Sequence, residues 1–142
     1  MPKLSVWMIR AALMDMGIGF LFGALILWHK GIPIAPWIWR LLNLHIELMI
    51  LGWTMQIIMG TAFFVLPRFG YQERRYGAER LGWLSFYLLN AGILITAASY
   101  WFAAMELALL GRVLTITAVI AYVVMIWPRV KPFAVETSSR LS

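Results

Sequence analysis

The sequence predicts an all-α membrane protein, a bundle of four transmembrane helices with both termini on the cytoplasmic side. Its 142 residues are 63% hydrophobic and 13% charged, whereas soluble domains are about half apolar and about a quarter charged. Four apolar segments also reach the roughly 20 residues that a helix needs to cross a bilayer. In a four-span arrangement most basic residues fall on one side of the membrane, which gives the orientation.

The four predicted helices span residues 7–28, 39–66, 81–103 and 106–127. Proline and glycine separate the first three segments and follow the fourth, as expected where helices end. The last connection, around residues 104–106, is so short that the helices on either side must form a tight antiparallel pair. We expect one transmembrane domain over residues 1–134 and a polar tail over 135–142. The N-terminus shows no cleavable signal pattern, so we treat the first segment as a retained helix.

Nine of the twelve basic residues lie on one side of this arrangement: Lys3, Arg10, Arg68, Arg74, Arg75, Arg80, Arg129, Lys131 and Arg140. The excess of Lys and Arg on the cytoplasmic side of membrane proteins predicts a multi-pass protein of the cell (inner) membrane with both termini inside. Tryptophans fall at both expected interfaces, with Trp28, Trp37, Trp39 and Trp101 outside and Trp7, Trp83 and Trp127 inside. Because topology accounts for the positive charge, we expect no nucleic-acid partner.

The second helix has polar residues on two faces. At about 100° per residue, one face holds His45, Gly52, Gln56 and Gly60, with Met59 and Phe63 alongside. The opposite face holds Asn43, Glu47, Thr54 and Thr61. We therefore expect this helix at the centre of the bundle or at an interface between protomers.

His45 is the main candidate for a functional residue, and two interpretations stay open. A histidine in a membrane span either hydrogen-bonds to a neighbouring helix or binds a metal, as an axial haem ligand does. Gly52 and Gly60 would let a flat macrocycle approach the helix, or they serve helix packing. His29 is either an interfacial residue, a second ligand to the same iron, or a metal ligand together with His45 and Glu47.

The remaining ionisable residues of the spans need partners. Glu47 and Arg112 each lie roughly 12 Å from the outer end of their helices at 1.5 Å per residue, so we predict an ion pair. Arg112 and Arg40 are alternatively contacts for haem propionates.

The first helix carries Asp15, Gly19 and Gly23 at i, i+4 and i+8, which predicts a packing face. Asp15 is expected to pair with Arg10 or Arg80, with a proton-relay role as the alternative. Met105, near the outer end of its helix, is a remote candidate for a second axial ligand.

One segment resembles a known family. It runs Arg40-Leu-Leu-Asn-Leu-His45-Ile-Glu-Leu-Met-Ile-Leu-Gly52-Trp and continues with Gly60-Thr-Ala-Phe-Phe-Val-Leu-Pro67-Arg68. This looks like the second transmembrane helix of haem–copper oxidase subunit I, closest to the nitric-oxide reductase and C-type oxidase branches. The resemblance implies that His45 is an axial ligand of a low-spin haem b near the outer face. It is specific over roughly residues 40–69 and general over the other spans.

The chain also departs from that family. The family fold has many more helices, and its oxygen-reducing centre needs more histidines than the two present here. A haem in this chain would take its second ligand from His29, Met105, the His45 of a second copy, a partner subunit, or nothing. We therefore expect no complete enzyme.

Three functions remain open on the sequence. The first is a haem b protein for electron transfer or diatomic gas binding, with a possible redox partner on the outer side. The second is a non-catalytic subunit, or homo-oligomer, of a respiratory or photosynthetic membrane complex. The third is a metal-binding membrane protein or transporter that uses His29, His45 and Glu47. The absence of cysteine excludes iron–sulfur clusters and covalent c-type haem.

Overall fold

The computed structural model describes residues 1–67 and 76–130, and every regular element within them is a helix. Four helical stretches are long and apolar enough to cross a membrane: α1 (Lys3–Gly31), Pro36–Val65, α4 (Glu79–Phe102) and Met105–Arg129. The last consists of α5 (Met105–Ile126) and the 3₁₀ turn η3 (Trp127–Arg129). The all-helical fold with four helices of spanning length is confirmed. Each helix begins before its apolar segment, because the backbone hydrogen bonds continue into the polar ends.

The second spanning stretch is not one regular α-helix. It comprises the 3₁₀ helix η1 (Pro36–Arg40), α2 (Leu41–Glu47), the π-helix η2 (Leu48–Met55) and α3 (Gln56–Val65). Proline fits at the start of η1 because the first residues of a helix need no backbone donor. In η2 the hydrogen bonds reach one residue further than in an α-helix, a geometry that occurs frequently at functional sites. Hydrophobicity alone predicts a single continuous helix here and does not reveal the π segment.

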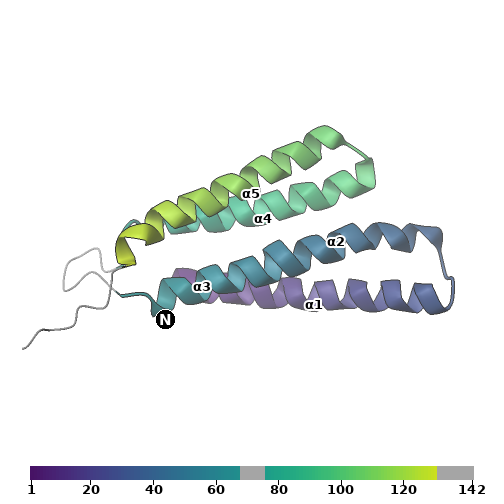
Figure 1. Cartoon of the computed structure of the whole chain (residues 1–142), viewed down its shortest axis with the longest axis horizontal. Coiled ribbons are helices and arrows are strands. Elements are labelled where there is room, and N and C mark those ends of the chain that lie inside the picture. The colour runs from purple at the N-terminus through teal and green to yellow at the C-terminus, as the bar shows by residue number, and fades with distance from the viewer. Residues whose placement is uncertain (68–75, 131–142) are drawn as a thin grey trace, which may run out of the picture.

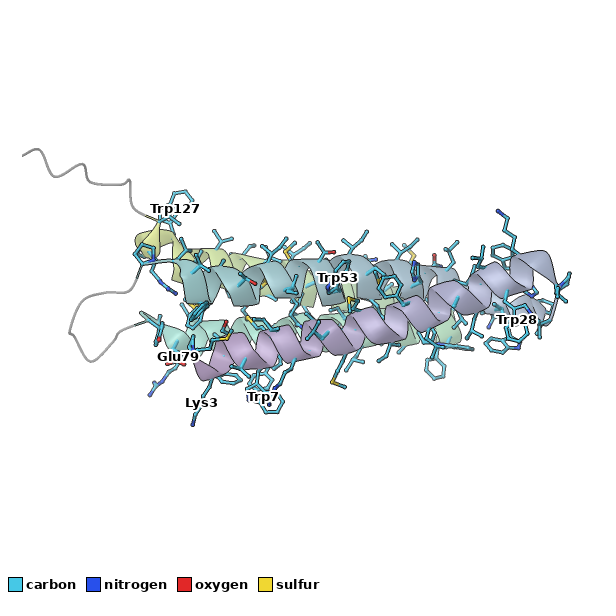
Figure 2. The ribbon with its side chains drawn as sticks, turned by 90° about the horizontal axis from the view of Figure 1, so that it is seen from below. Lys3, Trp7, Trp28, Trp53, Glu79 and Trp127 are labelled. Atoms are coloured by element: carbon cyan, nitrogen blue, oxygen red, sulfur yellow. The ribbon has the colours of Figure 1, made fainter. Side chains whose placement is uncertain are left out.

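The four stretches form two antiparallel hairpins that lie side by side (Figure 1). In one, α1 packs along α2, η2 and α3; in the other, α4 packs on α5. The start of α1 and the end of α5 lie at the same end of the bundle. Trp7 and Trp127 lie towards this end, and Trp28 lies at the opposite one (Figure 2). The chain therefore runs up and down four times, as the short connections predict.

The core between the hairpins consists of apolar side chains from all four stretches: Leu4, Met8, Met59, Phe63, Leu89, Ile93, Ala118, Tyr122 and Met125. Many large apolar side chains point outward instead, such as Leu27 (70% exposed) and Phe102 (75% exposed). Monomeric soluble proteins rarely expose so much apolar surface to water, whereas apolar side chains are the usual contacts of lipid tails. The outward-facing side chains therefore agree with a bilayer environment.

The α4–α5 hairpin is packed closely enough to exclude side chains at two glycines. A Cβ added at Gly92 would lie 2.8 Å from the carbonyl oxygen of Gly111 and 3.0 Å from the backbone nitrogen of Thr115. Small residues of this kind let helix backbones approach in membranes. The turn between the helices uses Ala103 in the left-handed region, at a φ of 51°. The tight antiparallel pair expected from the short connection is present.

Arg129 closes the end of the bundle where α3 and α5 finish. Its side chain is 1% exposed, and it donates to the carbonyl oxygens of Phe63 (2.9 Å), Leu66 (2.7 Å) and Pro67 (3.0 Å). Its guanidinium carbon lies 5.0 Å from the centre of the Phe63 ring. The last carbonyl groups of a helix have no hydrogen-bond donor within that helix. Arg129 supplies the missing donors for the end of α3, although it follows α5 in the chain.

Candidate functional site

His45 lies on α2 and faces α1, with its ring over Gly23. Its Nδ1 lies 2.7 Å from the carbonyl oxygen of Gly19. A carbonyl oxygen can only accept, so Nδ1 carries the proton and Nε2 carries the lone pair of the neutral ring. Within residues 1–67 and 76–130, Nε2 makes no hydrogen bond. The bond to Gly19 is the one expected of a histidine held by a neighbouring helix, and it also leaves one ring nitrogen available, as a metal-binding imidazole requires.

The glycines of α1 make room for this side chain. A Cβ at Gly23 would lie 3.0 Å from Cε1 of His45, and a Cβ at Gly19 would lie 2.7 Å from Sδ of Met49. The predicted packing face of Asp15, Gly19 and Gly23 is therefore confirmed, and α2 and η2 lie against it. The i, i+4 spacing of the two glycines places both on the side of α1 that contacts the second span.

His29 has a structural role that argues against its assignment as a second ligand. It is 8% exposed, and its Nδ1 accepts hydrogen bonds from the backbone N–H of Ile34 (2.9 Å) and Ala35 (3.3 Å). The lone pair of Nδ1 is thus used, and Nε2 carries the proton. His29 also lies six residues beyond Gly23 on α1, which corresponds to about 9 Å along the axis. It holds the loop between α1 and η1 instead, with its ring edge-on to Trp39.

The candidate sulfur ligands do not complete the site within one chain. Met105 is 76% exposed at the first residue of α5, and no contact joins it to His45 in the described part of the chain. Met49 lies beside Gly19, but it belongs to the same spanning stretch as His45, one turn further on. Two side chains from one face of a helix cannot bind opposite sides of a macrocycle. A second axial ligand would therefore come from another molecule.

Gly52 and Gly60 are used for packing against α1, the second of the two interpretations. A Cβ at Gly52 would lie 2.6 Å from Oδ2 of Asp15, and one at Gly60 would lie 3.0 Å from Cβ of Met8. Ser5 also donates a hydrogen bond to the Gly60 carbonyl. The side chains of α1 thus occupy the space that a macrocycle would need at these glycines.

Glu47 and Arg112 contact each other, as their matched depths predict. Nη1 of Arg112 lies 2.8 Å from Oε1 of Glu47, and Nη2 lies 3.4 Å from the hydroxyl of Tyr100. Glu47 is 4% exposed, whereas the Arg112 side chain is 47% exposed. Arg112 thus compensates a buried charge while its guanidinium stays accessible at the bundle surface. Arg40, at the end of η1, is exposed.

The expected cluster of His29, His45 and Glu47 does not form. Among the described residues, no group of three or more His, Cys, Asp or Glu side chains is close enough to bind one metal ion. His29 faces the η1 loop, His45 faces α1, and Glu47 faces Arg112 on α5. The three side chains diverge because they lie at different depths or on different faces.

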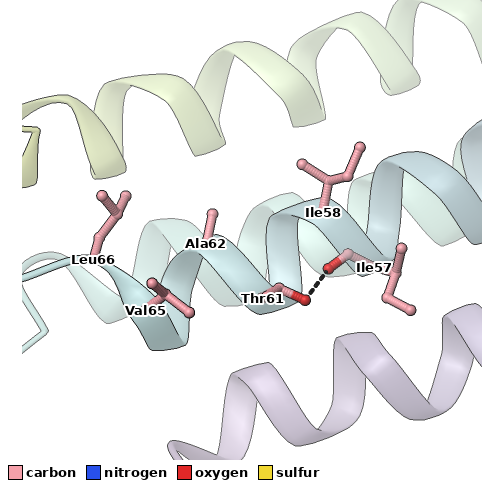
Figure 3. A pocket seen from close by; sticks show the side chains of 6 residues that line it. All are labelled: Ile57, Ile58, Thr61, Ala62, Val65 and Leu66. Atoms are coloured by element: carbon pink, nitrogen blue, oxygen red, sulfur yellow. Dashed lines mark hydrogen bonds between the residues drawn. The ribbon is translucent and has the colours of Figure 1, made fainter.

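On the polar face opposite His45, Glu47 is buried within the chain and the other three residues are exposed, so the bundle does not enclose this face and its location at an interface between protomers stays a prediction. Thr54 and Thr61 are exposed, and their hydroxyls donate to the carbonyl oxygens of Met49 (2.8 Å) and Ile57 (2.7 Å) of the same stretch. Threonine can satisfy its hydroxyl in this way and face lipid at little cost. Asn43 is also exposed. Thr61 lies in an apolar groove of about 490 Å³ (Figure 3), lined by Ile57, Ile58, Thr61, Ala62, Val65 and Leu66.

Asp15 has neither of its expected partners. Its carboxyl packs on Gly52 of η2, and Oδ2 is buried with no hydrogen-bond partner in the described residues. Arg10 and Arg80 are exposed, so both point away from the packing face on which Asp15 lies. The prediction of an ion pair is wrong, because the helix turns Asp15 inward against the second span.

Sequence reasoning missed three polar contacts between the hairpins. Asn90 donates to Oε1 of Gln56 at 2.7 Å, Tyr122 donates to the carbonyl of Met59 at 2.5 Å, and Arg129 binds the end of α3. A signal existed for Asn90, since an amide in the middle of an apolar segment requires a partner. The basic residue after Pro128 was counted as interfacial, and nothing in the sequence distinguishes it from one that folds back. Arg68, Arg74, Arg75, Lys131 and Arg140 lie outside the described residues.

No family model and no solved structure matches the chain. A cytochrome c oxidase subunit 1 homolog of Agrobacterium tumefaciens (strain T37) is 31% identical over 68 residues. The chain is loosely related to oxidase subunit I. The match covers 48% of this chain and 12% of the oxidase homolog, so the chain spans about an eighth of that relative.

Proposed function

We propose that the chain is a haem b-binding membrane protein in which Nε2 of His45 is an axial ligand of the iron, acting in electron transfer or in binding a diatomic gas. The observation that supports this most is the hydrogen bond from Nδ1 of His45 to the Gly19 carbonyl. Histidines that bind metals almost always donate their other N–H to such an acceptor, which fixes the tautomer and raises the basicity of the ligand. The loose relation to oxidase subunit I supports the same group.

The chain's own residues have defined tasks in this proposal. His45 binds the iron, Gly19 orients the imidazole, and Gly23 leaves space for the ring. Arg40 and the accessible side of Arg112 are the cations available to propionates on the outer half of the bundle. When bound, the haem supplies a one-electron redox centre or a gas-binding iron, depending on its second axial position. A second copy, a partner subunit, or Met105 of another molecule would fill that position for electron transfer.

The orientation belongs to the same proposal. With both termini in the cytoplasm of a bacterial cell and the chain in the inner membrane, His45 lies in the outer half of the bilayer. A redox partner would then approach from the outer side. The excess of basic residues in the N-terminal segment, the second connection and the C-terminal segment of the sequence supports this direction.

A non-catalytic subunit of a larger membrane complex is the second candidate, and Arg112 favours it. An arginine side chain that is 47% exposed within a span is costly next to lipid tails. A neighbouring subunit that covers Arg112 would remove this cost. Purification in mild detergent tests the candidate, since it requires that the chain migrate with a partner or as a higher oligomer.

Absorption spectroscopy of the purified protein tests the haem proposal directly. The chain is expressed with haem precursor supplied, purified in mild detergent, and its haem content is measured per chain. We expect a Soret band in the wild type, its loss in His45→Ala, and its retention in the matched control His29→Ala. Absence of a Soret band from folded wild-type protein would refute the proposal, and so would equal haem content in the two variants.

A further inference from the structure

A layer of polar groups crosses the middle of the bundle, away from His45. It consists of Asp15 on α1, Gln56 at the start of α3 and Asn90 on α4. At 1.5 Å per residue, the three residues lie about 14 to 18 Å from the same end of their helices, so they share a depth. The surroundings of this layer are apolar, with Leu89 and Ile93 of the core on α4. Neither the packing of the bundle nor the proposed haem site requires such groups here.

The hydrogen bonds of this layer are incomplete. Gln56 is 0% exposed and accepts from Asn90 at 2.7 Å, yet its Nε2 is buried and has no hydrogen-bond partner within residues 1–67 and 76–130. Oδ2 of Asp15 is also buried without a partner in the described residues. Buried polar groups in native proteins are nearly always hydrogen-bonded. Within a bilayer, each polar group without a hydrogen bond costs on the order of several kcal/mol. One unsatisfied donor and one unsatisfied acceptor therefore point to a small polar species between them.

The two unsatisfied atoms lie at adjacent turns of the second span, Oδ2 of Asp15 against Gly52 from α1 and Nε2 on Gln56 itself. The Asp15 carboxyl packs on Gly52, and Gln56 follows Gly52 by one turn. Gly60, a further turn on, also faces α1, so Gln56 lies between two residues of the α1 contact. A Cβ at Gly52 would lie 2.6 Å from Oδ2 and 2.8 Å from Cγ of Asp15, which means that glycine at this position of the π-helix makes room for the carboxyl group.

We propose that Asp15, Gln56 and Asn90 form an internal proton-binding site, in which the Asp15 carboxyl holds an exchangeable proton and the Gln56 amide donates to it through a bridging water. No cation pairs with Asp15 among the described residues. An ionised carboxylate without a counter-charge is very costly in an apolar medium, and a proton removes that charge. The bond that forms and breaks is the carboxyl O–H, with water as the proton donor and acceptor.

Infrared spectroscopy of the full-length protein tests this site without any substitution. Asp15 is the only aspartate in the sequence, so aspartate carrying ¹³C in its side-chain carboxyl, introduced by cell-free synthesis into vesicles, reports on one residue. We expect the labelled group to show the C=O band of a protonated carboxyl at neutral pH and to shift in D₂O. A labelled signal of an ionised carboxylate, or a C=O band that ignores D₂O, would overturn the proposal.

Two variants test whether the three residues form one site. Gln56→Leu removes the amide donor, and we expect the Asp15 C=O band to move to higher frequency because the carboxyl group loses the water-mediated hydrogen bond. Thr54→Val removes a lipid-facing hydroxyl of the same stretch and should leave the band in place. If Gln56→Leu leaves it unchanged in folded protein, Asp15 does not share a site with Gln56.

Discussion

The imidazole of His45 donates a hydrogen bond of 2.7 Å to the backbone of Gly19 on the neighbouring helix. This bond depends on how closely α1 and α2 approach, because the ring lies over Gly23 and a Cβ there would be 3.0 Å from it. The packing of two helices thus decides which ring nitrogen keeps its lone pair. A substitution in α1 should therefore change the orientation and hydrogen bonding of the His45 ring, although His45 itself is unchanged.

Gly23→Ala should displace the His45 ring and lower the haem content of the purified protein. Overpacking in a well-packed interior typically costs about 1–3 kcal/mol, so we expect a lower midpoint in thermal unfolding as well. Gly17→Ala is the matched control, since nothing lies within 4 Å of a Cβ at that position of the same helix. Equal haem content in the two variants would show that the contact at Gly23 does not position the ligand.

Arg112→Leu should destabilise the bundle, because it leaves the buried carboxylate of Glu47 without a partner. Breaking a buried ion pair costs about 3–5 kcal/mol, and we expect the lower part of this range because Arg112 is half exposed. Adding Glu47→Gln to this variant should recover much of the loss, as measured by denaturation in detergent. If Arg112→Leu alone changes neither stability nor haem content, neither the structural nor the propionate role is correct.

Tyr122→Phe removes the hydroxyl that makes one of the polar contacts between the hairpins. The hydrogen bond to the Met59 carbonyl is buried, and the net contribution of a typical hydrogen bond to stability is about 0.5–1.5 kcal/mol. Tyr87→Phe is the control, because Tyr87 is 62% exposed. Thermal unfolding followed by near-ultraviolet circular dichroism should separate the two variants. Identical midpoints would mean that the hydrogen bond from Tyr122 to Met59 does not stabilise the association of the hairpins.

The sequence predicts the helices well because crossing a bilayer demands a long apolar run, which composition shows directly. It also predicts the Glu47–Arg112 contact, since two opposite charges at the same depth in an apolar medium are stabilised when they form an ion pair. The sequence does not predict the contacts of a residue when these depend on which way its side chain points from the helix. Asp15 turns inward rather than towards Arg10, and Thr54 faces outward because it satisfies its hydroxyl on its own helix.

The second limit concerns the backbone. The π-helix η2 places Gly52 against Asp15, but its residues are the same apolar types that form α-helices in membranes. Likewise, the role of His29 depends on a loop that directs two N–H groups at its ring. No sequence pattern distinguishes that histidine from a ligand, and the distinction becomes visible once the loop conformation is known.

Arg129→Met should loosen the last turn of α3. The substitution removes three charge-assisted hydrogen bonds to carbonyl oxygens, and a single bond of this kind is worth about 1.5–3 kcal/mol. We expect faster amide exchange over residues 63–66 in hydrogen–deuterium exchange, with little change in α1. Arg80→Met, at an exposed position, is the control. Unchanged exchange in Arg129→Met would show that the end of α3 is held by packing on Phe63 instead.

The proposed orientation can be tested with single cysteines, because the natural sequence has none. Lys3 and Lys30 are both exposed and lie at opposite ends of α1. A membrane-impermeant maleimide added to intact spheroplasts should label Lys30→Cys, whereas Lys3→Cys should react only after lysis. The excess of basic residues in the N-terminal, second connecting and C-terminal segments of the sequence predicts this result. The reverse pattern would place His45 in the inner half of the bilayer, and a redox partner of the proposed haem would then have to be cytoplasmic.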